Sequence, residues 1–459
     1  MKPLAWLRGV SCFLVWVVFS PLVARAEEPG LFHQTAHEVL KKYAHAPDSS
    51  YAWKVRQQAK VGPHEVVEII MTSQTWRGIT WKHQLYLLKP AKVTNTRAVL
   101  VIAGGSWRKA YEEPPQGLDI PREAHVLAQV AQELGSVVAV VKHVPFQPVF
   151  GGMVEDEIIS YTFDRFLRTG DTSWPLLRPM VKSAVRAMDT VQAHCQKAWN
   201  VQIDGFTLTG ASKRGWTTWL TSAVDPRVKA LAPMVIDVLN MQEHLKLQLA
   251  CWGEFSEQIA DYTRRHIPER MNTPLGKFLN AVVDPFHHRH YITQPKLIIN
   301  GTNDRYWPLE ALNLYWPHLH GPRWVLYVPN NGHGLKDFVR VVGAIAALHA
   351  HNTGSKPLPQ MDWQWKQHRD GSWTIRLQTN PAPEQVRLWL AQSDSMDFRP
   401  VRWTSRTLKA DAEGTWSFTL RPDQQQYRAA FLEAQWSRGP LPLYLSTAIR
   451  VAKPPAAKQ

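Results

Sequence analysis

The feature that most constrains the fold is a regular alternation between residues 97 and 351. Short apolar runs rich in strand-forming residues alternate there with longer stretches whose apolar residues repeat at helical spacing. The strand-like runs are 98–103, 137–141, 206–209, 230–236, 296–300 and 324–328. The helical stretches are 122–134, 176–199, 214–223, 309–318 and 335–351. Strands separated by helices of this length predict βαβ units, and hence a mainly parallel sheet with helices on both faces.

Two further strand-like runs precede this series, at 66–71 and 81–88, and an Arg77-Gly78 turn between them indicates an antiparallel pair. An antiparallel pair followed by a wound parallel series is the order of the α/β-hydrolase fold, which we predict for residues 27–356. Polar helical segments at 240–291 interrupt the alternation. We expect them to form a helical cap over the carboxyl edge of the sheet.

The pattern changes after a proline-rich segment at 356–359. Residues 361–453 contain short strand-like runs separated by turn residues, namely 374–377, 386–390, 416–420, 429–433 and 443–446. Short strands at this spacing predict a small C-terminal β-sandwich of immunoglobulin-like type.

The first 26 residues predict a secretory signal. Lys2 and Arg8 precede an apolar run at about 10–19, and Ala24-Arg25-Ala26 offers a site for signal peptidase. The run is shorter than the ~20 residues that a membrane-spanning helix needs. We therefore expect an exported protein, periplasmic or secreted after cleavage near Ala26. Cleavage would remove Cys12, and the sequence leaves open whether the remaining Cys195 and Cys251 pair.

The charge of the chain is strongly basic. Lysine and arginine outnumber aspartate and glutamate by 53 to 38, which gives a net charge of +15. This excess favours an anionic partner such as a cell-envelope surface. The basic residues are spread thinly along the chain, as on an ordinary solvated surface, so we expect no nucleic-acid partner.

Ser212 is the first candidate for chemistry, because active sites in open parallel sheets lie just after the strands. It follows the run at 206–209 within the string Gly-Ala-Ser-Lys-Arg-Gly and leads straight into a helix. A serine on such a turn exposes its hydroxyl, and the helix amino terminus favours developing negative charge. The usual motif has glycine two residues after the serine, where this chain has Arg214. A serine at this place could also be a plain helix cap.

Asp304 and His333 follow the strand-like runs at 296–300 and 324–328, so the chain order is serine, aspartate, histidine. This is the order that α/β hydrolases use. An imidazole takes the serine proton, and a carboxylate fixes its tautomer and stabilises the imidazolium. Asp237, directly after the run at 230–236, is an alternative acid.

Two backbone donors would complete such a site as an oxyanion hole. We expect the N–H of Lys213, and that of Gly105 or Ser106 in the loop after the run at 98–103. The glycine pair Gly104-Gly105 could also serve only to permit a tight turn.

We expect no metal and no organic cofactor. A zinc hydrolase using His33, His37 and the histidine cluster at 287–290 is a remote alternative, since His33 and His37 lack an intervening glutamate and a clear third ligand.

Several strings along the chain, including the one around Ser212, resemble the PhoPQ-activated pathogenicity-related protein family. The resemblance runs from about Asp48 into the C-terminal region, and the strings that carry it are 48–53, 72–78, 81–83, 210–216, 225–228, Pro329-Asn330 with His333, and 397–399. It implies an exported α/β hydrolase in which Ser-Lys-Arg-Gly is the family's own elbow variant. It also implies a link to virulence and to resistance against cationic antimicrobial peptides, but no substrate. Dipeptidyl-peptidase-like hydrolases share the triad order, which extends the expected substrates to peptides by analogy.

The sequence therefore predicts an exported serine hydrolase that acts on a small-molecule ester or peptide. Its predicted catalytic residues are Ser212, Asp304 and His333. The alternative is a non-catalytic secreted binding protein on a hydrolase scaffold.

Overall fold

The fold is that of a computed structural model, which describes residues 31–115 and 122–455. The predicted signal segment, its cleavage site near Ala26 and Cys12 lie outside the described residues. Within the described ranges, no helix combines the length and the apolar character needed to cross a bilayer.

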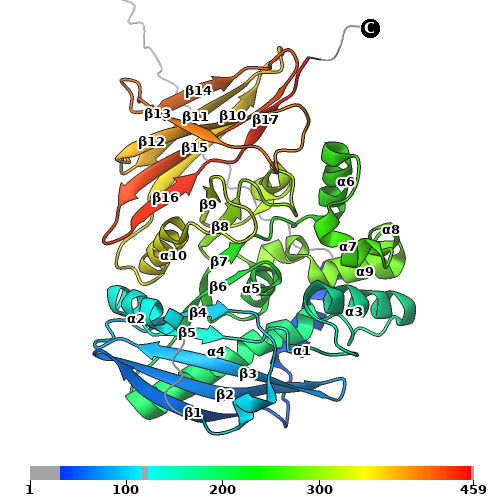
Figure 1. Cartoon of the computed structure of the whole chain (residues 1–459), viewed down its shortest axis with the longest axis vertical. Coiled ribbons are helices and arrows are strands. Elements are labelled where there is room, and N and C mark those ends of the chain that lie inside the picture. The colour runs from blue at the N-terminus through cyan, green and yellow to red at the C-terminus, as the bar shows by residue number, and fades with distance from the viewer. Residues whose placement is uncertain (1–30, 116–121, 456–459) are drawn as a thin grey trace, which may run out of the picture.

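One large sheet runs through the molecule (Figure 1). Its first nine strands lie in the order β1-β2-β3-β5-β4-β6-β7-β8-β9. Their bounds are β1 Ala52–Val61, β2 His64–Trp76, β3 Ile79–Lys89, β4 Arg97–Ile102, β5 Val138–Val141, β6 Gly205–Ala211, β7 Val228–Met234, β8 Lys296–Gly301 and β9 Arg323–Val328. Pairs up to β3–β5 are antiparallel, and every pair from β5 to β9 is parallel. The α/β class with a mainly parallel central sheet is thus confirmed.

The central strands are rich in apolar residues and largely buried because both faces of the sheet are covered. All six residues of β8 are buried, and only the last residue of β6 is partly exposed. The register pairs Ile102 with Gly210, Ala211 with Met234, and Gly301 with Val328. The carboxyl ends of β4, β6, β7, β8 and β9 therefore lie at one edge, where their following loops meet.

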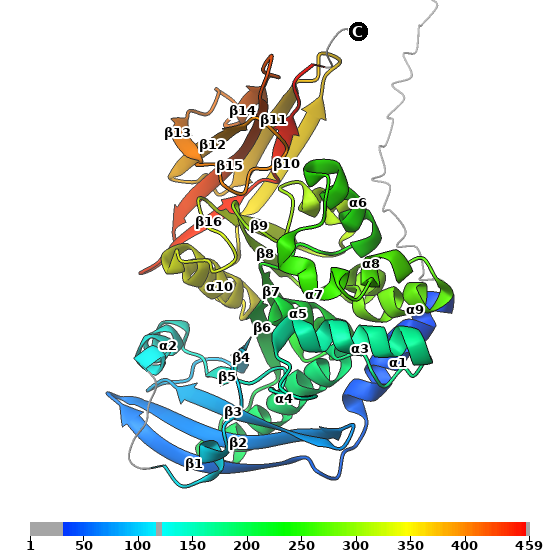
Figure 2. The same ribbon diagram turned by 45° about the vertical axis from the view of Figure 1, so that its right-hand side comes forward.

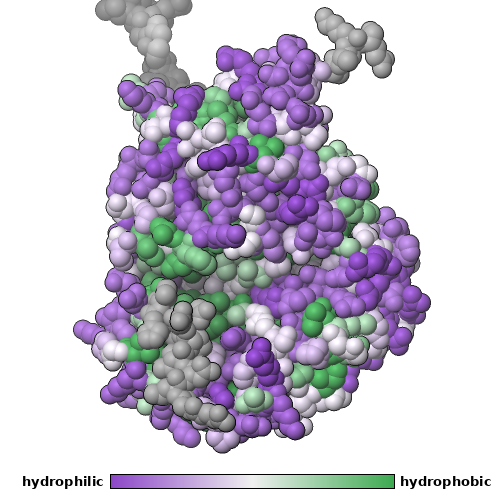
Figure 3. Space-filling view, in the orientation of Figure 1, coloured by the Kyte–Doolittle hydropathy of each residue, from purple (hydrophilic) through white to green (hydrophobic). Residues whose placement is uncertain are grey.

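Helices cover the two faces of the sheet (Figure 2). On one face α2 (Arg122–Leu134) packs against α10 (Phe338–Asn352), and on the other α1 (Leu31–His45), α4 (Leu177–Trp199) and α5 (Lys213–Val224) pack together. Phe338 and Val339, which begin α10, are the most exposed large apolar side chains of the described part. Figure 3 shows apolar surface over this helix on an otherwise largely hydrophilic face.

The helices differ from the prediction in two places. Helix α3 (Glu155–Thr169) has no counterpart among the predicted elements. The predicted helix at 309–318 is two short 3₁₀ turns, η4 (Ala311–Leu314) and η5 (Trp316–His318). Pro317 explains the second difference, because proline lacks the N–H that a continuing helix would need.

Short helical segments occupy the region predicted as a cap. They are α6 (Met241–Trp252), η2 (Glu257–Ile259), α7 (Ala260–Thr263), α8 (Ile267–Arg270), α9 (Pro274–Val283) and η3 (Pro285–Tyr291). In Figure 2 helices α6 to α9 gather beside α3, on one side of the parallel strands.

The C-terminal strands form two sheets at the top of Figure 1. Their bounds are β10 Gln360–Gln367, β11 Trp373–Asn380, β12 Gln385–Ser393, β13 Thr404–Leu408, β14 Trp416–Leu420, β15 Tyr427–Ser437, β16 Pro442–Ser446 and β17 Arg450–Ala452. Strands β10, β11 and β14 form a separate sheet, whereas β16, β15, β12 and β13 continue the large sheet beyond β9. The junction is an antiparallel pairing of Ser446 with Val325. Leu377 of β11 and Leu432 of β15 belong to one buried core with Leu326 of β9, so the two halves share apolar packing.

Candidate active site

Ser212 sits on a sharp turn between β6 and α5. Its backbone has φ 57° and ψ −127°, a conformation that non-glycine residues rarely adopt. Its N–H donates to the Met234 carbonyl at 2.8 Å, which fixes the turn against β7. A Cβ atom at Gly210 would lie 2.7 Å from the Arg214 carbonyl oxygen, and one at Gly215 would lie 2.9 Å from the Gly210 carbonyl oxygen. Gly215 thus permits the close packing of strand and helix one position later than in the usual motif.

Asp304 and His333 are in direct contact. The Nδ1 atom of His333 lies 2.8 Å from Oδ2 of Asp304, and since a carboxylate only accepts, Nδ1 carries the proton. The other carboxylate oxygen, Oδ1, accepts the backbone N–H of Tyr306 at 3.0 Å. Nε2 of His333 is buried and has no hydrogen-bond partner among the described residues. The imidazole is therefore oriented by the carboxylate, with its second nitrogen unoccupied.

Tyr306 lies against His333 and lines the same cavity as Ser212. Its ring centroid lies 4.3 Å from that of His333. Both Tyr306 and Ser212 line a cavity of about 100 Å³. The loops after β6, β8 and β9 thus bring the three sequence-predicted residues to the same edge of the sheet.

Asp237, the alternative acid, has a different partner. It is buried after β7, and its Oδ1 accepts the Tyr315 hydroxyl at 2.5 Å. Burial raises the pKa of Asp237 to about 7, and the nearby charge of Asp304 adds to this effect. Of the two carboxylates, the structure places Asp304 against the imidazole.

The loop after β4 is fixed beside the segment after β5. The Gly104 carbonyl accepts the His143 N–H, and the Ala103 carbonyl accepts the Val144 N–H, both at 3.1 Å. Gly105 has φ 116°, and a Cβ there would lie 3.0 Å from Nδ1 of His143, so both conformation and space call for glycine. The second predicted donor, Lys213, is in the first turn of α5, where helical geometry leaves N–H groups without intrahelical partners.

A partly buried ionic cluster includes the two residues that follow the serine in the chain. Nζ of Lys213 is 2.8 Å from Oε2 of Glu155 and 3.1 Å from Oδ2 of Asp156. The Arg214 guanidinium binds both carboxylate oxygens of Glu155 at 2.7 Å, and its Nε donates to the Val144 carbonyl at 2.6 Å. Burial alone would raise the pKa of Glu155, but the Arg214 and Lys213 charges outweigh it and hold the pKa at about 2.

The cluster explains why arginine follows the serine at the second position. Arg214 joins the Ser212 turn to the chain at Val144 and lies so close to Gly104 that a Cβ there would be 2.5 Å from its Nη2. Sequence reasoning missed Glu155 and Asp156, although an acidic triplet at 155–157 was a visible signal.

The cavity is mostly apolar. Its apolar wall includes Trp216, Ile236, Met241, Leu245, Ile267 and Met271. Met241 and Leu245 come from α6, so the predicted cap forms part of the wall. Its polar residues are largely occupied, since Asp156 accepts the Tyr262 hydroxyl at 3.0 Å and pairs with Lys213. Burial lowers the pKa of His244 to about 3, so this side chain is neutral.

The other candidate histidines form a packed pair. Nδ1 of His37 lies 3.3 Å from Nδ1 of His288, and the His37 ring stacks on Tyr291 at 3.6 Å. The side chain of His33 lies outside the described residues. Among those described, no group of three or more histidine, cysteine, aspartate or glutamate residues is placed to hold a metal ion. Cys195 and Cys251 are both free thiols.

Comparison with known proteins decides the family. The sequence matches the PhoPQ-activated pathogenicity-related protein family over residues 40–399. The chain belongs to this family. This confirms the resemblance seen in the Ser-Lys-Arg-Gly elbow and the other strings.

Autocrine proliferation repressor protein A from Dictyostelium discoideum is 29% identical to this chain over 433 residues. The match covers 86% of this chain and 85% of the Dictyostelium protein. Among solved structures, acetyl xylan esterase 1 from a Thermoanaerobacterium species has a TM-score of 0.47 at 17% identity, over 68% of this chain and 92% of its own. A glucuronoyl esterase from Solibacter usitatus has a TM-score of 0.36 at 15% identity, over 65% and 87%. At these TM-scores the likenesses carry no argument about the reaction.

Proposed function

We propose that this protein is a serine hydrolase in which Ser212 is the nucleophile, His333 the general base, and Asp304 the carboxylate that orients the imidazole. The observation that supports it best is the 2.8 Å contact between His333 and Asp304. That contact leaves Nε2 of His333 as the available base, and Ser212 is held on a strained turn at the same edge of the sheet.

The reaction would proceed by acyl transfer to water. Oγ of Ser212 attacks the substrate carbonyl carbon while Nε2 of His333 takes the hydroxyl proton, and Asp304 stabilises the imidazolium. The imidazolium then gives its proton to the leaving alcohol or amine as the acyl–serine ester forms. A water molecule, deprotonated by the same nitrogen, attacks this ester and releases the carboxylic acid and the free serine.

Backbone N–H groups would stabilise the oxyanion in both halves of the reaction. We assign this role to the N–H of Lys213 and to that of Gly105, because the first opens α5 and the second lies in the fixed loop after β4. The Lys213 ammonium is engaged by Glu155 and Asp156, so its contribution comes from the backbone.

The cavity supports an apolar acyl group on the substrate. Its wall is formed by aliphatic and aromatic side chains from α3, α5, α6, α8 and the loop after β7, while its ionic groups already pair with each other. A short or branched apolar acyl group removes this surface from water without leaving a charge unpaired. An ester or a peptide bond to such a group is the substrate class that we propose.

Fluorophosphonate labelling tests this proposal without knowledge of the substrate. We expect the wild-type protein to be captured covalently and Ser212→Ala to remain unlabelled. Ser222→Ala is a matched control, since Ser222 is a buried serine of the same helix whose hydroxyl donates to the Thr218 carbonyl. A folded wild-type protein that is not labelled contradicts the proposal. A panel of chromogenic esters and aminoacyl amides then separates esterase from peptidase activity.

The second candidate is a non-catalytic secreted binding protein on a hydrolase scaffold. The observation in its favour is that the Dictyostelium discoideum relative is named a proliferation repressor, a name that states no reaction. The same labelling experiment decides between the two, because only an enzyme requires a reactive Ser212.

We also propose that the chain is exported after loss of residues 1–26. In the rest of the chain, we propose that residues 27–356 form an α/β-hydrolase domain with a cap at 240–291. Residues 361–453 would then form an immunoglobulin-like sandwich. The apolar amino-terminal run and the two C-terminal sheets support this division. The family name supports a role in pathogenicity. The net charge of +15, which loss of Lys2, Arg8 and Arg25 lowers to +12, supports an anionic envelope surface as partner. Mass spectrometry of the mature amino terminus tests the export.

A further inference from the structure

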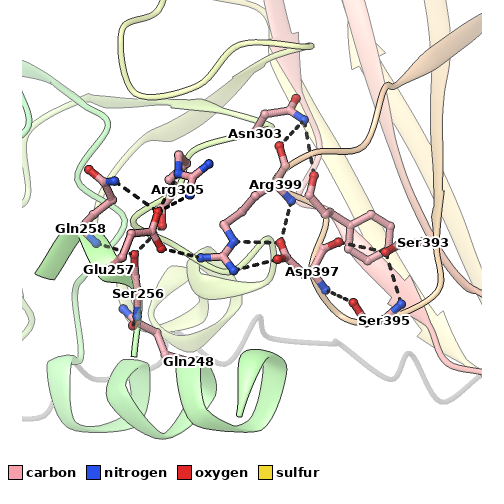
Figure 4. Close-up of polar contacts among 11 residues, drawn as sticks. Gln248, Ser256, Glu257, Gln258, Asn303, Arg305, Ser393, Ser395, Asp397 and Arg399 are labelled. Atoms are coloured by element: carbon pink, nitrogen blue, oxygen red, sulfur yellow. Dashed lines mark hydrogen bonds and ion pairs between the residues drawn. The ribbon is translucent and has the colours of Figure 1, made fainter. Parts of the chain in front are cut away.

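The loop that carries Asp304 is attached to the C-terminal half of the chain. Residues 397–403, which we call the connector, form the second part of the segment between β12 and β13. The Nδ2 atom of Asn303 lies 3.4 Å from the Phe398 carbonyl oxygen and 3.2 Å from that of Arg399 (Figure 4). It lies 2.7 Å from a third connector carbonyl oxygen, that of Val401. The residue directly before the proposed acid is therefore held by the connector.

The loop that carries His333 is attached to the same connector. Nδ2 of Asn330 donates to the Trp403 carbonyl at 3.0 Å, and the Trp403 N–H donates back to Oδ1 of Asn330 at 2.8 Å. The two loops are also joined to each other, since the Asn303 N–H donates to the Asn331 carbonyl at 2.9 Å. Connector, acid loop and base loop thus form one hydrogen-bonded unit.

An ionic bridge fixes the outer side of this unit (Figure 4). The Glu257 carboxylate of the cap accepts Nε of Arg305 at 2.6 Å and Nη1 of Arg399 at 3.2 Å. Arg399 is itself held by a two-point contact with Asp397 at 2.7 and 2.8 Å. The neighbouring Ser256 hydroxyl donates to the Arg305 carbonyl at 2.7 Å. Cap and connector therefore meet at the residue that follows Asp304.

We propose that the connector is a positioning element of the active site, and that Asn303 and Asn330 are the residues through which it acts. This inference rests on the proposed serine hydrolase function. The amide nitrogens of both asparagines bond to connector carbonyls and not to the His333–Asp304 pair, so their role is to hold the loops on which the acid and the base sit. A misplacement of about 1 Å costs about 10²-fold in rate. Loss of the connector bonds should therefore slow the reaction without abolishing it.

The experiment compares labelling rates of full-length variants with an excess of fluorophosphonate. We expect Asn303→Ala to be labelled about 10²-fold more slowly than wild type. Asn313→Ala should match wild type. Nδ2 of Asn313, on η4, also donates to a C-terminal carbonyl, that of Ile449 at 3.0 Å, but Ile449 is not part of the connector. The downfield imidazole N–H proton resonance of His333 should shift or vanish in Asn303→Ala and persist in Asn313→Ala.

Several outcomes overturn the inference while leaving the proposed function in place. They are wild-type labelling in Asn303→Ala, equal slowing in Asn303→Ala and Asn313→Ala, and slowing with an unchanged imidazole resonance. If Asn303→Ala does not fold, Asn330→Ala is judged by the same comparison. If Asn330→Ala does not fold either, the labelling rate of Glu257→Gln is compared with that of wild type. The Glu257 side chain is 48% exposed, so its replacement should leave the fold intact. Wild-type labelling in Glu257→Gln then refutes the positioning role. An unlabelled wild-type protein instead refutes the proposed function itself.

Discussion

Replacing Glu155 with glutamine should lower the free energy of unfolding by about 2 kcal/mol near neutral pH. Lys213 and Arg214 hold the pKa of this carboxyl at about 2, against an ordinary value of 4.5. That difference corresponds to about 3 kcal/mol. The Glu155 side chain is 37% exposed, so we reduce the figure to about 2 kcal/mol for solvent screening.

The same contact predicts how the loss depends on pH. The unfolded chain protonates Glu155 below about pH 4.5, whereas the folded chain does so only near pH 2. Stabilisation by the ionised carboxylate is therefore complete above the unfolded pKa and disappears as the pH falls through the folded one. At about pH 3.5 the difference between wild type and Glu155→Gln should be smaller than at neutral pH, by about 1 kcal/mol.

Urea unfolding of both proteins at the two pH values provides the measurement. Glu157→Gln is the matched control, because Glu157 lies in the same first turn of α3 and has only a long, exposed ion pair with Arg265 at 3.8 Å. We expect this variant to stay within about 0.5 kcal/mol of wild type. A Glu155→Gln protein as stable as wild type at neutral pH, or one whose deficit is the same at both pH values, would refute the reasoning.

Two further predictions concern Asp237 and the cavity. Burial raises the pKa of Asp237 from 3.8, its ordinary value in the unfolded chain, to about 7 in the folded chain. The wild-type protein should therefore lose stability as the pH rises from about 3.8 to about 7. Asp237→Asn should not show this loss, because the asparagine side chain does not ionise. Between about pH 5 and pH 8 the asparagine variant should gain about 3 kcal/mol relative to wild type in urea unfolding, and parallel pH profiles would contradict this. Leu245→Trp should fill part of the cavity and raise KM for esters with branched acyl groups about tenfold or more, while acetyl esters are hydrolysed as before. Leu249→Trp, an exposed position of the same helix outside the cavity wall, is the control, and equal effects of both tryptophans would argue against the assigned acyl site.

The sheet and the placement of the three proposed catalytic residues could be predicted because both follow from local pattern. Strands buried on two faces are rich in apolar and β-branched residues, as in β4 and β8, and such runs are visible in the sequence. Once the strands are parallel, residues that directly follow them share one edge. This rule predicts Ser212, Asp304 and His333 as one set. In the structure Asp304 and His333 are in contact, and Ser212 follows β6 at the same edge of the sheet.

What could not be predicted depends on partners far apart in the chain. Arg214 and Glu155 are separated by 59 positions, and Asn303 and Phe398 by 95, with no periodicity to connect them. Helix α3 was missed because β-branched and aromatic side chains are mixed with its acidic residues. Strand β1 was missed because most of its residues are polar and solvent-accessible, which removes the apolar alternation that marks a strand.

The pairing of Ser446 with Val325 bears on how this protein can be shortened. A chain ended after α10 would lose β16 and expose β9 as a bare edge, including the Tyr327 N–H that now donates to the Ser446 hydroxyl at 3.1 Å. Trp324 of the same strand would also lose the Pro359 carbonyl that accepts its indole N–H at 2.8 Å. Unpaired strands of this kind recruit other chains and promote aggregation. Recombinant versions should therefore keep the polypeptide through β17, and affinity tags are best appended beyond it.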